Sequence, residues 1–438
     1  MSGLRMLGAA LDPILDELRA RPAMHVTEVL AVLLRVCRAH EDFLVRHKLA
    51  HEHFAAVAAL EARLARACPD RGRERWSAAT LAALAGELEA ANHAVPAPLV
   101  ARAAARWLER THRAHLVHYF RGCDRAVRAG EPWPIVDSPA RCYPLPTGNP
   151  QSRGRPADRG EWLTLFPEQT GGLEVRLRWC GPHLPVLRRG SRVAVGVVAK
   201  DVGDFEFDRL SPGGAPRFYR VRPRVPAYWA RIEAVLAHAR ALDVEVLVLP
   251  ELALTDELHA RLIAHPVARE LPLLVAGSHH VARTGDEPGR NVTTVLARGR
   301  VLAEHAKMAD FFFRDGGVER FEHIQPGGVI TVLVSDQASA LVLICKDALR
   351  ADWQHLTTQL APRLLLVPSM TSEYSDFSTF AERLARDPQA HTLLANIGPA
   401  TAVFGRPSRE DPVIVMDSDV GRCILYEVGQ GVSEIGGL

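Results

Sequence analysis

Three residues of different chemical type could build a reactive site in this chain, in the order Glu251, Lys307 and Cys345. A cysteine thiolate is an effective nucleophile, but a free thiol has a pKa of about 8.5 and needs a nearby base or positive charge to ionise. A glutamate among apolar residues could accept the thiol proton, because burial raises the pKa of its carboxyl group. A lysine ammonium could stabilise the anion that forms when the thiolate attacks an amide or nitrile carbon.

Lysine is rare in this chain, which draws attention to Lys307. Only 4 of the 53 basic residues are lysine, and the others are Lys48, Lys200 and Lys346. An ammonium is compact and can concentrate its charge on one oxygen atom, whereas the guanidinium of arginine is broad and fork-shaped. We therefore expect that arginine cannot replace Lys307 in this chemistry.

All three residues follow segments that are typical of strands. The segments are residues 244–250 before Glu251, residues 340–344 before Cys345, and residues 293–297, the turn 298–300 and residues 301–306 before Lys307. Continuous apolar, β-branched runs indicate buried parallel strands. Because sites in open α/β sheets form at the carboxyl ends of strands, we expect these three ends to converge. A helix predicted to begin near Ala348 would place Cys345 on a strand-to-helix turn.

The chain resembles the nitrilase superfamily of carbon-nitrogen hydrolases in three fragments, which are Leu249-Pro250-Glu251-Leu252, His305-Ala306-Lys307-Met308 and Leu343-Ile344-Cys345-Lys346-Asp347. The resemblance covers roughly residues 190–438. It implies an α/β fold, a four-layer α-β-β-α sandwich, with no metal and no organic cofactor. It also implies that Cys345 is the acylated nucleophile, Glu251 the general base and Lys307 the stabiliser of the tetrahedral intermediate. The backbone N–H of Lys346 could provide a second hydrogen bond to the oxyanion.

The resemblance implies a second glutamate between the lysine and the cysteine. Residues 317–327 contain Glu319 and Glu322 ahead of a Pro-Gly turn. Glu319 has the better distance to Pro326, so we predict that it is the second glutamate, with Glu322 as the alternative. Both could also be solvated charges. Asn396 matches an asparagine of the family that could bind substrate or the oxyanion, or it could simply be a turn former at a strand end.

The residues after Cys345 favour cleavage of an amide over cleavage of a nitrile. Nitrilases in the narrow sense usually carry Trp and Glu at these positions, whereas this chain has Lys346 and Asp347. Residues 201–224, rich in Asp, Phe, Tyr and Arg, could line the pocket. We expect a small-molecule, amide-type substrate. Two alternatives stay open: an acyl transferase in which an amine resolves the same intermediate, and a non-catalytic binding or sensor module.

The composition changes along the chain and predicts three regions. Residues 1–130 are rich in Ala, Leu, Arg and Glu at helical spacing, which predicts an all-α domain of unknown role. Helices are expected at 39–67, 77–92 and 97–129. Residues 131–189 are rich in Pro, Gly and Arg and predict a linker, in which residues 162–165 and 173–179 could form a small hairpin. Residues 190–438 are the predicted hydrolase domain.

The overall composition is that of an ordinary soluble protein. The chain has 438 residues, 47% of them hydrophobic and 24% charged, with a net charge of +2. It lacks an apolar run of the roughly 18 residues that a membrane span requires. Acidic residues near the start argue against a signal peptide, so we expect a cytoplasmic protein. Seven cysteines without a Cys-x-x-Cys pair predict reduced thiols.

Partners are predicted only in outline. His112, His115 and His118 share a predicted helix, but a zinc site usually needs a ligand from another element, so we expect no metal. Acidic residues balance the many arginines of the helical region, so nucleic acid is not an expected partner. The resemblance implies a homodimer or a higher homo-oligomer. The N-terminal helical domain could bind a protein partner.

Overall fold

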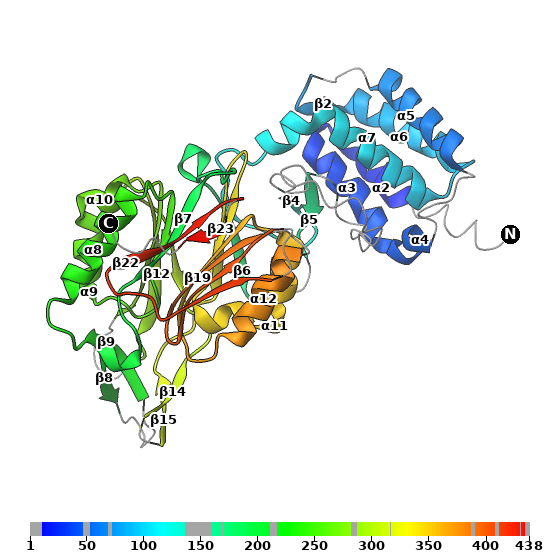
Figure 1. Ribbon diagram of the computed structural model, residues 1–438. Coiled ribbons are helices and arrows are strands. Elements are labelled where there is room, and N and C mark those ends of the chain that lie inside the picture. The colour runs from blue at the N-terminus through cyan, green and yellow to red at the C-terminus, as the bar shows by residue number, and fades with distance from the viewer. Residues whose placement is uncertain are drawn as a thin grey trace. The chain divides into compact units, whose positions relative to one another are not determined.

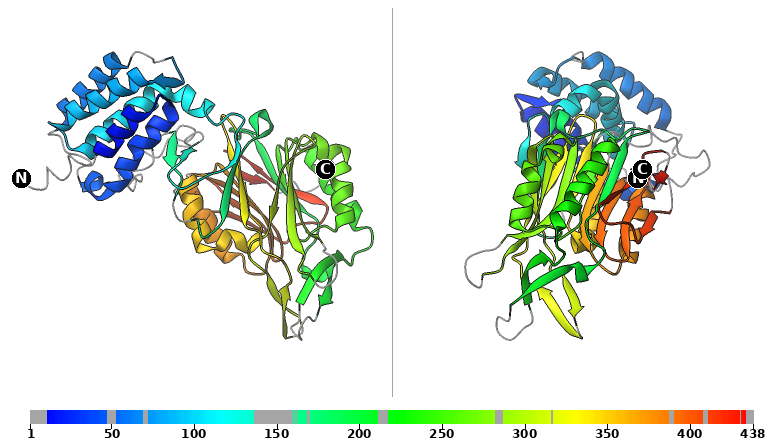
Figure 2. Two further views of the ribbon diagram at one scale, coloured as in Figure 1. Left: turned by 180° about the vertical axis from the view of Figure 1, so that it is seen from behind. Right: turned by 60° about the vertical axis from the view of Figure 1, so that its left-hand side comes forward.

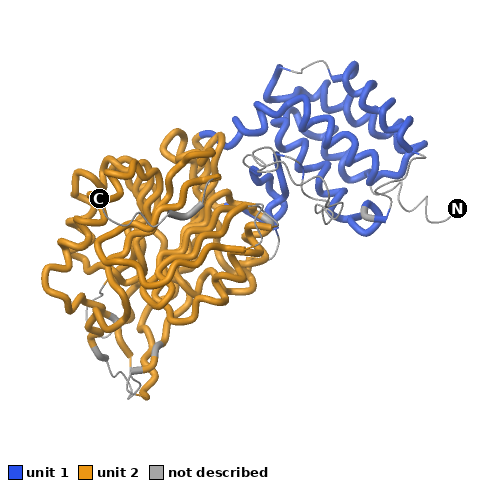
Figure 3. Tube along the Cα trace, in the orientation of Figure 1, with its two compact units in different colours: residues 1–121, 127–168 blue, residues 122–126, 169–438 orange. Residues whose placement is uncertain are grey.

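The computed structural model describes residues 11–46, 53–68, 72–135, 160, 162–167, 170–210, 217–281, 287–315, 317–386, 390–407, 411–429 and 431–433. The chain divides into two compact units, one of residues 1–121 and 127–168 and the other of residues 122–126 and 169–438 (Figure 3). Most of the Pro-rich part of the expected linker, residues 136–159, lies outside the described residues. The part from residue 170 to 189 belongs to the second unit.

The first unit is mainly helical. Its helices are α2 (Asp12–Ala20), α3 (Val26–Ala39), α4 (Glu41–Arg46), α5 (Phe54–Ala67), α6 (Ala78–Asn92) and α7 (Ala97–His118). Helix α3 begins at a capping box in which the His25 side chain accepts from Thr27 N–H and Glu28 accepts from His25 N–H. Strands β1 (Ala23–His25) and β2 (Arg75–Ser77) also pair, so this region is not all-α.

The hairpin predicted in the linker is wrong. Strand β5 (Leu163–Leu165) pairs with β4 (Pro132–Pro134) in the first unit, where all three of its residues are buried. Strand β6 (Glu174–Trp179) joins a large sheet of the second unit instead. It alternates exposed Glu174 and Arg176 with buried Val175 and Leu177. Each apolar piece therefore buries its side chains in a different core.

The second unit contains two large sheets, and the first has seven strands. Their order is β13-β12-β11-β10-β7-β22-β23. The bounds are β7 (Arg192–Val197), β10 (Val246–Val248), β11 (Leu273–Val281), β12 (Arg290–Ala297), β13 (Arg300–Ala306), β22 (Arg422–Glu427) and β23 (Gly431–Ser433). Helices α8 (Tyr228–Ala241), α9 (Asp256–Ala264) and α10 (Pro266–Glu270) pack on this sheet.

The second sheet has eight strands in the order β21-β20-β19-β18-β17-β16-β6-β3. The bounds are β3 (Asp124–Ala126), β16 (Val329–Val334), β17 (Ser339–Val342), β18 (Leu364–Met370), β19 (His391–Ile397), β20 (Ala400–Gly405) and β21 (Val413–Met416). The 3-10 helix η6 (Cys345–Leu349) contacts β18, α11 (Ala351–Leu360) follows η6, and α12 (Ser375–Arg386) packs on β19 and β20.

The two sheets face each other, and helices cover their outer faces (Figures 1 and 2). Strands β7, β10 and β11 of the first sheet contact β18 and β19 of the second. Strands β7, β10 and β11 run parallel, as do β17, β18 and β19. Every residue of β10, β17, β18 and β19 is buried, which explains why these strands read as continuous apolar runs. The predicted mixed α/β class is confirmed.

A small four-stranded sheet completes the second unit. Its order is β14-β15-β9-β8, with bounds β8 (Phe205–Leu210), β9 (Arg217–Pro223), β14 (Phe312–Asp315) and β15 (Val318–Glu322). The short 3-10 helix η4 (Val202–Asp204) leads directly into β8, and a second one, η3 (Gly181–His183), follows β6. Among the helices that the structure describes, none has the length and apolar composition needed to cross a bilayer.

Candidate active site

The three candidate residues all follow strands of the second unit. Glu251 comes three residues after β10, and Lys307 directly follows β13, both in the seven-stranded sheet. Cys345 opens η6 after β17, in the eight-stranded sheet. The exposed fraction is 0% for Glu251 and Lys307 and 1% for Cys345. Ser369, on β18 of the eight-stranded sheet, bonds to both residues: its carbonyl accepts from Glu251 N–H at 3.2 Å, and its hydroxyl donates to Cys345 Sγ at 3.3 Å.

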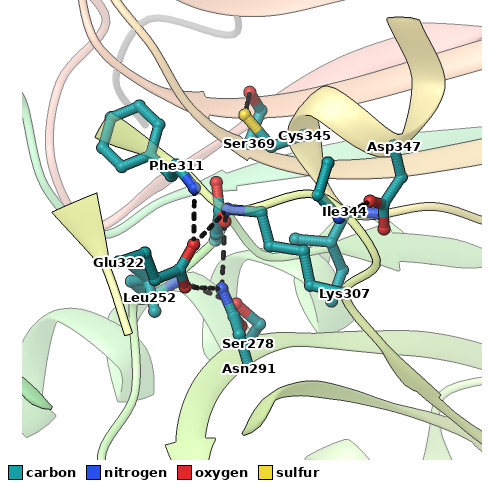
Figure 4. Close-up of polar contacts among 12 residues, drawn as sticks. Leu252, Ser278, Asn291, Lys307, Phe311, Glu322, Ile344, Cys345, Asp347 and Ser369 are labelled. Carbon is teal, nitrogen blue, oxygen red and sulfur yellow. Dashed lines mark hydrogen bonds and ion pairs between the residues drawn. The ribbon is translucent and has the colours of Figure 1, made fainter. Parts of the chain in front are cut away.

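Lys307 lies between two buried carboxylates, of which Figure 4 labels that of Glu322. Its Nζ is 2.6 Å from Glu251 Oε1 and 2.6 Å from Glu322 Oε2. The side-chain amide of Asn291 donates to the same pair, to Glu251 Oε1 at 3.0 Å and to Glu322 Oε1 at 2.8 Å. An ammonium has three N–H groups. Two of them point to the carboxylates, which leaves one for a further acceptor.

The glutamate beside Lys307 is Glu322, and the prediction of Glu319 is corrected. Glu322 is 1% exposed, whereas the side chain of Glu319 is 45% exposed and binds Arg314 at 3.0 Å. Both glutamates lie on β15, where successive side chains point to opposite faces. Because the two residues are three positions apart, only one of them can face the site.

Glu322 is held in its ionised form. His280 Nε2 is 2.7 Å from Oε1, and the backbone N–H of Phe311 donates to Oε2 at 3.0 Å. Burial raises the pKa of a carboxyl group, but the Lys307 ammonium and the His280 hydrogen bond outweigh burial and lower the pKa of Glu322 to about 2. Glu322 is therefore a fixed negative charge at neutral pH.

Glu251 has the opposite electrostatic balance. Burial raises its pKa above the ordinary value, and the Glu322 charge adds to this rise, although Lys307 opposes it. Its Oε1 is bound by Lys307 and Asn291, but no residue that the structure describes places a donor at ordinary hydrogen-bond distance from Oε2. The Cys345 thiol is near enough to lower the pKa of Glu251 by hydrogen bonding. When two carboxyl groups have pKa values pushed apart, the raised one can exchange a proton.

Lys307 stays protonated in this site. Burial alone would lower its pKa, but the neighbouring carboxylates of Glu251 and Glu322 raise the pKa well above the ordinary value. The ammonium is therefore available as a permanent positive charge inside the protein.

Cys345 occupies a strained turn. Its φ of 48° lies in the left-handed region, which costs a non-glycine residue about 1–3 kcal/mol and is common at functional sites. Burial and the Glu251 carboxylate raise the pKa of Cys345 to about 12, although Lys307 and hydrogen bonds from Ser369 and the Met370 N–H oppose this. The resting group is a thiol, so attack requires transfer of its proton.

The side chain and the backbone N–H of Lys346 lie in different surroundings. The side-chain Nζ lies 4.1 Å from the centre of the Phe312 ring, and the side chain is half-buried. The backbone N–H directly follows Cys345 at the first turn of η6. This placement keeps the backbone N–H as the candidate oxyanion donor and gives the ammonium no part in the cluster around Lys307.

The side-chain amide of Asn396 bonds to backbone groups. Its Oδ1 accepts from Thr371 N–H at 2.9 Å, and its Nδ2 donates to the carbonyls of Thr371 at 3.0 Å and Ala400 at 2.7 Å. Both amide hydrogens are therefore engaged by backbone. Asn396 thereby holds the segment that follows β18, and its predicted role in substrate or oxyanion binding stays a prediction.

Four polar residues of the site were not predicted: His280, Asn291, Asp347 and Ser369. His280 had a usable signal, because the polar run Ser278-His279-His280 interrupts an otherwise apolar strand. Asp347 was part of a quoted fragment but had no assigned role. Asn291 and Ser369 carry no local signal, since their partners come from distant strands.

No metal site is found within the described ranges, where no group of three or more His, Cys, Asp and Glu residues could hold an ion. His112 is buried beside Trp76 and Trp107, while His115 and His118 approach Glu74. The six described cysteines are free thiols, and Cys142 lies outside the described residues.

Comparison with known proteins adds structural neighbours only. A scan against protein-family models matches none, and a search of curated proteins matches none. A solved amidase from Nesterenkonia sp. is 18% identical, with a TM-score of 0.39 over 55% of this chain and 90% of that chain. A variant of the amidase from Nesterenkonia sp. AN1 in complex with butyramide is 16% identical, with a TM-score of 0.39 over 54% and 89%. A further variant, described as an amidase from the nitrilase superfamily, is 17% identical, with a TM-score of 0.39 over 54% and 90%. Each of these three comparisons covers about half of this chain, 54–55% of its length.

Proposed function

We propose that the chain is a carbon-nitrogen hydrolase of the nitrilase type that cleaves an amide bond through an acyl intermediate on Cys345. One observation carries the proposal. Glu251 has one anchored oxygen and one oxygen without a described donor, beside a thiol, while Lys307 has one N–H beyond its two carboxylate partners. This arrangement supplies a proton acceptor and an oxyanion donor at the same buried point.

Acylation begins with transfer of the Cys345 proton to Glu251 Oε2. The sulfur then attacks the amide carbon, and the electron pair of the C=O bond moves to oxygen. That oxyanion is bound by the third N–H of Lys307 and by the backbone N–H of Lys346. When the intermediate collapses, the C–N bond breaks and the leaving amine takes the proton from Glu251. The product is a thioester on Cys345.

Deacylation repeats the sequence with water. Glu251, again ionised, accepts a proton as water attacks the thioester carbon, and the same two donors bind the oxyanion. The C–S bond then breaks, and the thiolate regains its proton from Glu251. Glu322 stays ionised throughout, because its pKa of about 2 lies far below neutral pH. Its role is to hold the Lys307 ammonium in place.

The fold supports this proposal together with the sequence resemblance. The order of helices, sheet, sheet and helices supports a four-layer sandwich, and the three fragments of the resemblance lie at or shortly after the ends of β10, β13 and β17. The near-complete burial of the reacting groups favours a small molecule over a polypeptide as substrate.

The experiment compares the full chain with Cys345→Ala against a panel of primary amides, ureido compounds and nitriles. We expect ammonia release from an amide and an acyl adduct on Cys345 by intact-mass spectrometry, both lost in Cys345→Ala. Cys423→Ala is the matched control, because Cys423 is also buried and its pKa is also raised to about 12, by burial alone. Added hydroxylamine separates hydrolysis from acyl transfer, since an amine acceptor gives a hydroxamate. Equal activity in Cys345→Ala and the wild type would rule out the proposal.

A further inference from the structure

Asp347 is fully buried in η6 and accepts four hydrogen bonds. Its Oδ1 accepts from the backbone N–H groups of Met308 and Ala309, each at 2.9 Å. Its Oδ2 accepts from His305 Nε2 at 3.1 Å and from the backbone N–H of Ile344 at 3.4 Å. A single carboxylate therefore satisfies donors from two separate parts of the chain.

These two parts carry the reacting groups of the proposed mechanism. Met308 directly follows Lys307 at the end of β13, in the seven-stranded sheet. Ile344 directly precedes Cys345 after β17, in the eight-stranded sheet. Asp347, Ile344 and Lys307 lie close together on this side of the site (Figure 4). Asp347 thus ties the end of one sheet to the nucleophile turn of the other.

His305 supports the carboxylate from β13. It lies two residues before Lys307, so both side chains are on the same face of the strand. His305 is 4% exposed, and no described residue pairs with its Nδ1. A proton on Nδ1 would be a buried donor without a described acceptor, whereas a proton on Nε2 is accepted by the Asp347 carboxylate. That proton fixes the rotation of the Asp347 carboxylate.

We propose that Asp347 and His305 are positioning residues that hold the Lys307 ammonium and the Cys345 turn at the separation at which both reach one carbonyl group. This inference rests on the proposed function. The oxyanion must lie about 2.7–3.1 Å from each donor, and one donor comes from each sheet. A misplacement of about 1 Å can reduce a rate about 100-fold, so a tie between the sheets at this point governs acylation.

The chemistry of Asp347 defines a sharp substitution. In Asp347→Asn the remaining oxygen can still accept from Met308 and Ala309. Its new NH₂ group, however, faces the Nε2–H of His305 and the N–H of Ile344, so donors oppose donors. The side-chain volume is almost unchanged, so the hydrogen bonds to His305 and Ile344 are lost without creating a cavity. His305→Ala removes the supporting donor, whereas His305→Gln can place an N–H near the position of Nε2.

The test uses the full chain with these variants and His391→Ala as a control. His391 is a buried histidine (2% exposed) on β19, where its ring lies 6.0 Å from that of Tyr426. The rate of acyl-adduct formation is measured by rapid quench and intact mass, with the primary amide of the panel above that the wild type cleaves fastest. We expect Asp347→Asn and His305→Ala to slow acylation about 10- to 100-fold. His305→Gln should recover to within about threefold of wild type, and KM should change little, as expected for a geometric effect. His391→Ala should lose stability but keep its acylation rate.

A second measurement does not require amidase activity. Alkylation of Cys345 by iodoacetamide is followed against pH, and we expect both disruptive variants to react at higher pH than wild type, because the Lys307 charge no longer lies beside the sulfur. If the wild type forms no adduct with any compound of the panel, the proposed function fails. The pH profile of Cys345 alkylation alone then decides whether Asp347 and His305 are positioning residues. If Asp347→Asn does not fold, the contrast between His305→Ala and His305→Gln decides. Wild-type acylation and alkylation in the folded variants would overturn the inference.

Discussion

Replacement of Lys307 by arginine tests whether a compact ammonium is required between the two carboxylates. Lys307 is 0% exposed, and its Nζ lies 2.6 Å from both Glu251 Oε1 and Glu322 Oε2. A guanidinium keeps the charge but is wider, so it must displace one of the carboxylates. We expect a loss of about 1–3 kcal/mol in the free energy of unfolding, as for overpacking of a core. Removing the charge altogether would cost more, about 3–5 kcal/mol, because it leaves buried carboxylates unpaired.

The effect of Lys307→Arg on catalysis should exceed its effect on stability. Loss of one preorganised oxyanion donor costs about 10²- to 10³-fold in rate, or about 2.7–4 kcal/mol of transition-state stabilisation. Because the donor binds charge that exists only in the transition state, kcat for acylation should fall while KM stays nearly constant.

The assay is single-turnover formation of the acyl adduct on Cys345, with thermal unfolding as the check that the variant is folded. Lys200→Arg is the matched control, since Lys200 belongs to the same unit and its side chain is exposed. We expect Lys200→Arg to acylate like the wild type. A folded Lys307→Arg variant that also acylated at the wild-type rate would refute the proposal that the third N–H of Lys307 binds the oxyanion.

Four further predictions concern the carboxylates and the assembly. Glu322→Gln should slow acylation at least about tenfold by loosening Lys307, whereas Glu319→Gln breaks only an exposed pair with Arg314 and should change stability by less than about 1 kcal/mol. The pKa of Glu322 is lowered from 4.5 to about 2, so its contribution to stability is present above pH 4.5 and is lost as pH falls toward 2. Urea unfolding at pH 5 and pH 3 should therefore show a loss of about 2 kcal/mol in the free energy of unfolding that Glu322→Gln lacks. The pKa of Glu251 is raised, so ionisation of Glu251 lowers the free energy of unfolding as pH rises above 4.5. Glu251→Gln should therefore be more stable than the wild type at pH 7. Its acylation rate should fall about 10²- to 10⁴-fold, because the proton acceptor is lost. The homo-oligomer stays a prediction, and light scattering should give a mass of at least twice that of the chain.

The strands that carry the candidate site could be predicted because both of their faces are buried. A strand between a sheet and a helix layer has no solvent side, so its sequence is a continuous apolar run and its end is visible where polar residues begin. Residues 246–248 and 339–342 show this pattern, and Glu251 and Cys345 each follow after an apolar extension of two residues. For these two strands, the local sequence is therefore enough to predict both the strand and the position where it ends.

Pairing between distant strands could not be predicted from local patterns. Strand β6 runs parallel to β16 with Val175 opposite Ile330, and nothing near residue 175 indicates that partner. The short distance to residues 162–165 suggested a hairpin instead. Local turn signals describe neighbours in sequence, but a parallel pair requires a long crossover connection.

Whether Glu319 or Glu322 reaches Lys307 depends on the face of β15 on which each side chain lies. Distance to Pro326 along the chain favoured Glu319, but a strand side chain is directed by its parity. Residues 318–322 pair with β14 on one side and β9 on the other, and Glu322 lies opposite Phe218 in that register. The register depends on contacts outside the segment, so the sequence could offer both glutamates without separating them.

The assignment of the base depends on hydrogen bonds that no motif contains. Glu251 and Glu322 are the same residue type, equally buried and equally close to Lys307. They differ because Glu322 also receives hydrogen bonds from His280 and the Phe311 N–H, whereas no described donor lies within ordinary hydrogen-bond distance of Glu251 Oε2. Extra donors stabilise the ionised form of one carboxyl group, and its charge then raises the pKa of the other. A change that removed the His280 hydrogen bond would therefore bring the two pKa values closer together, and the division between a fixed anion and a proton acceptor would weaken.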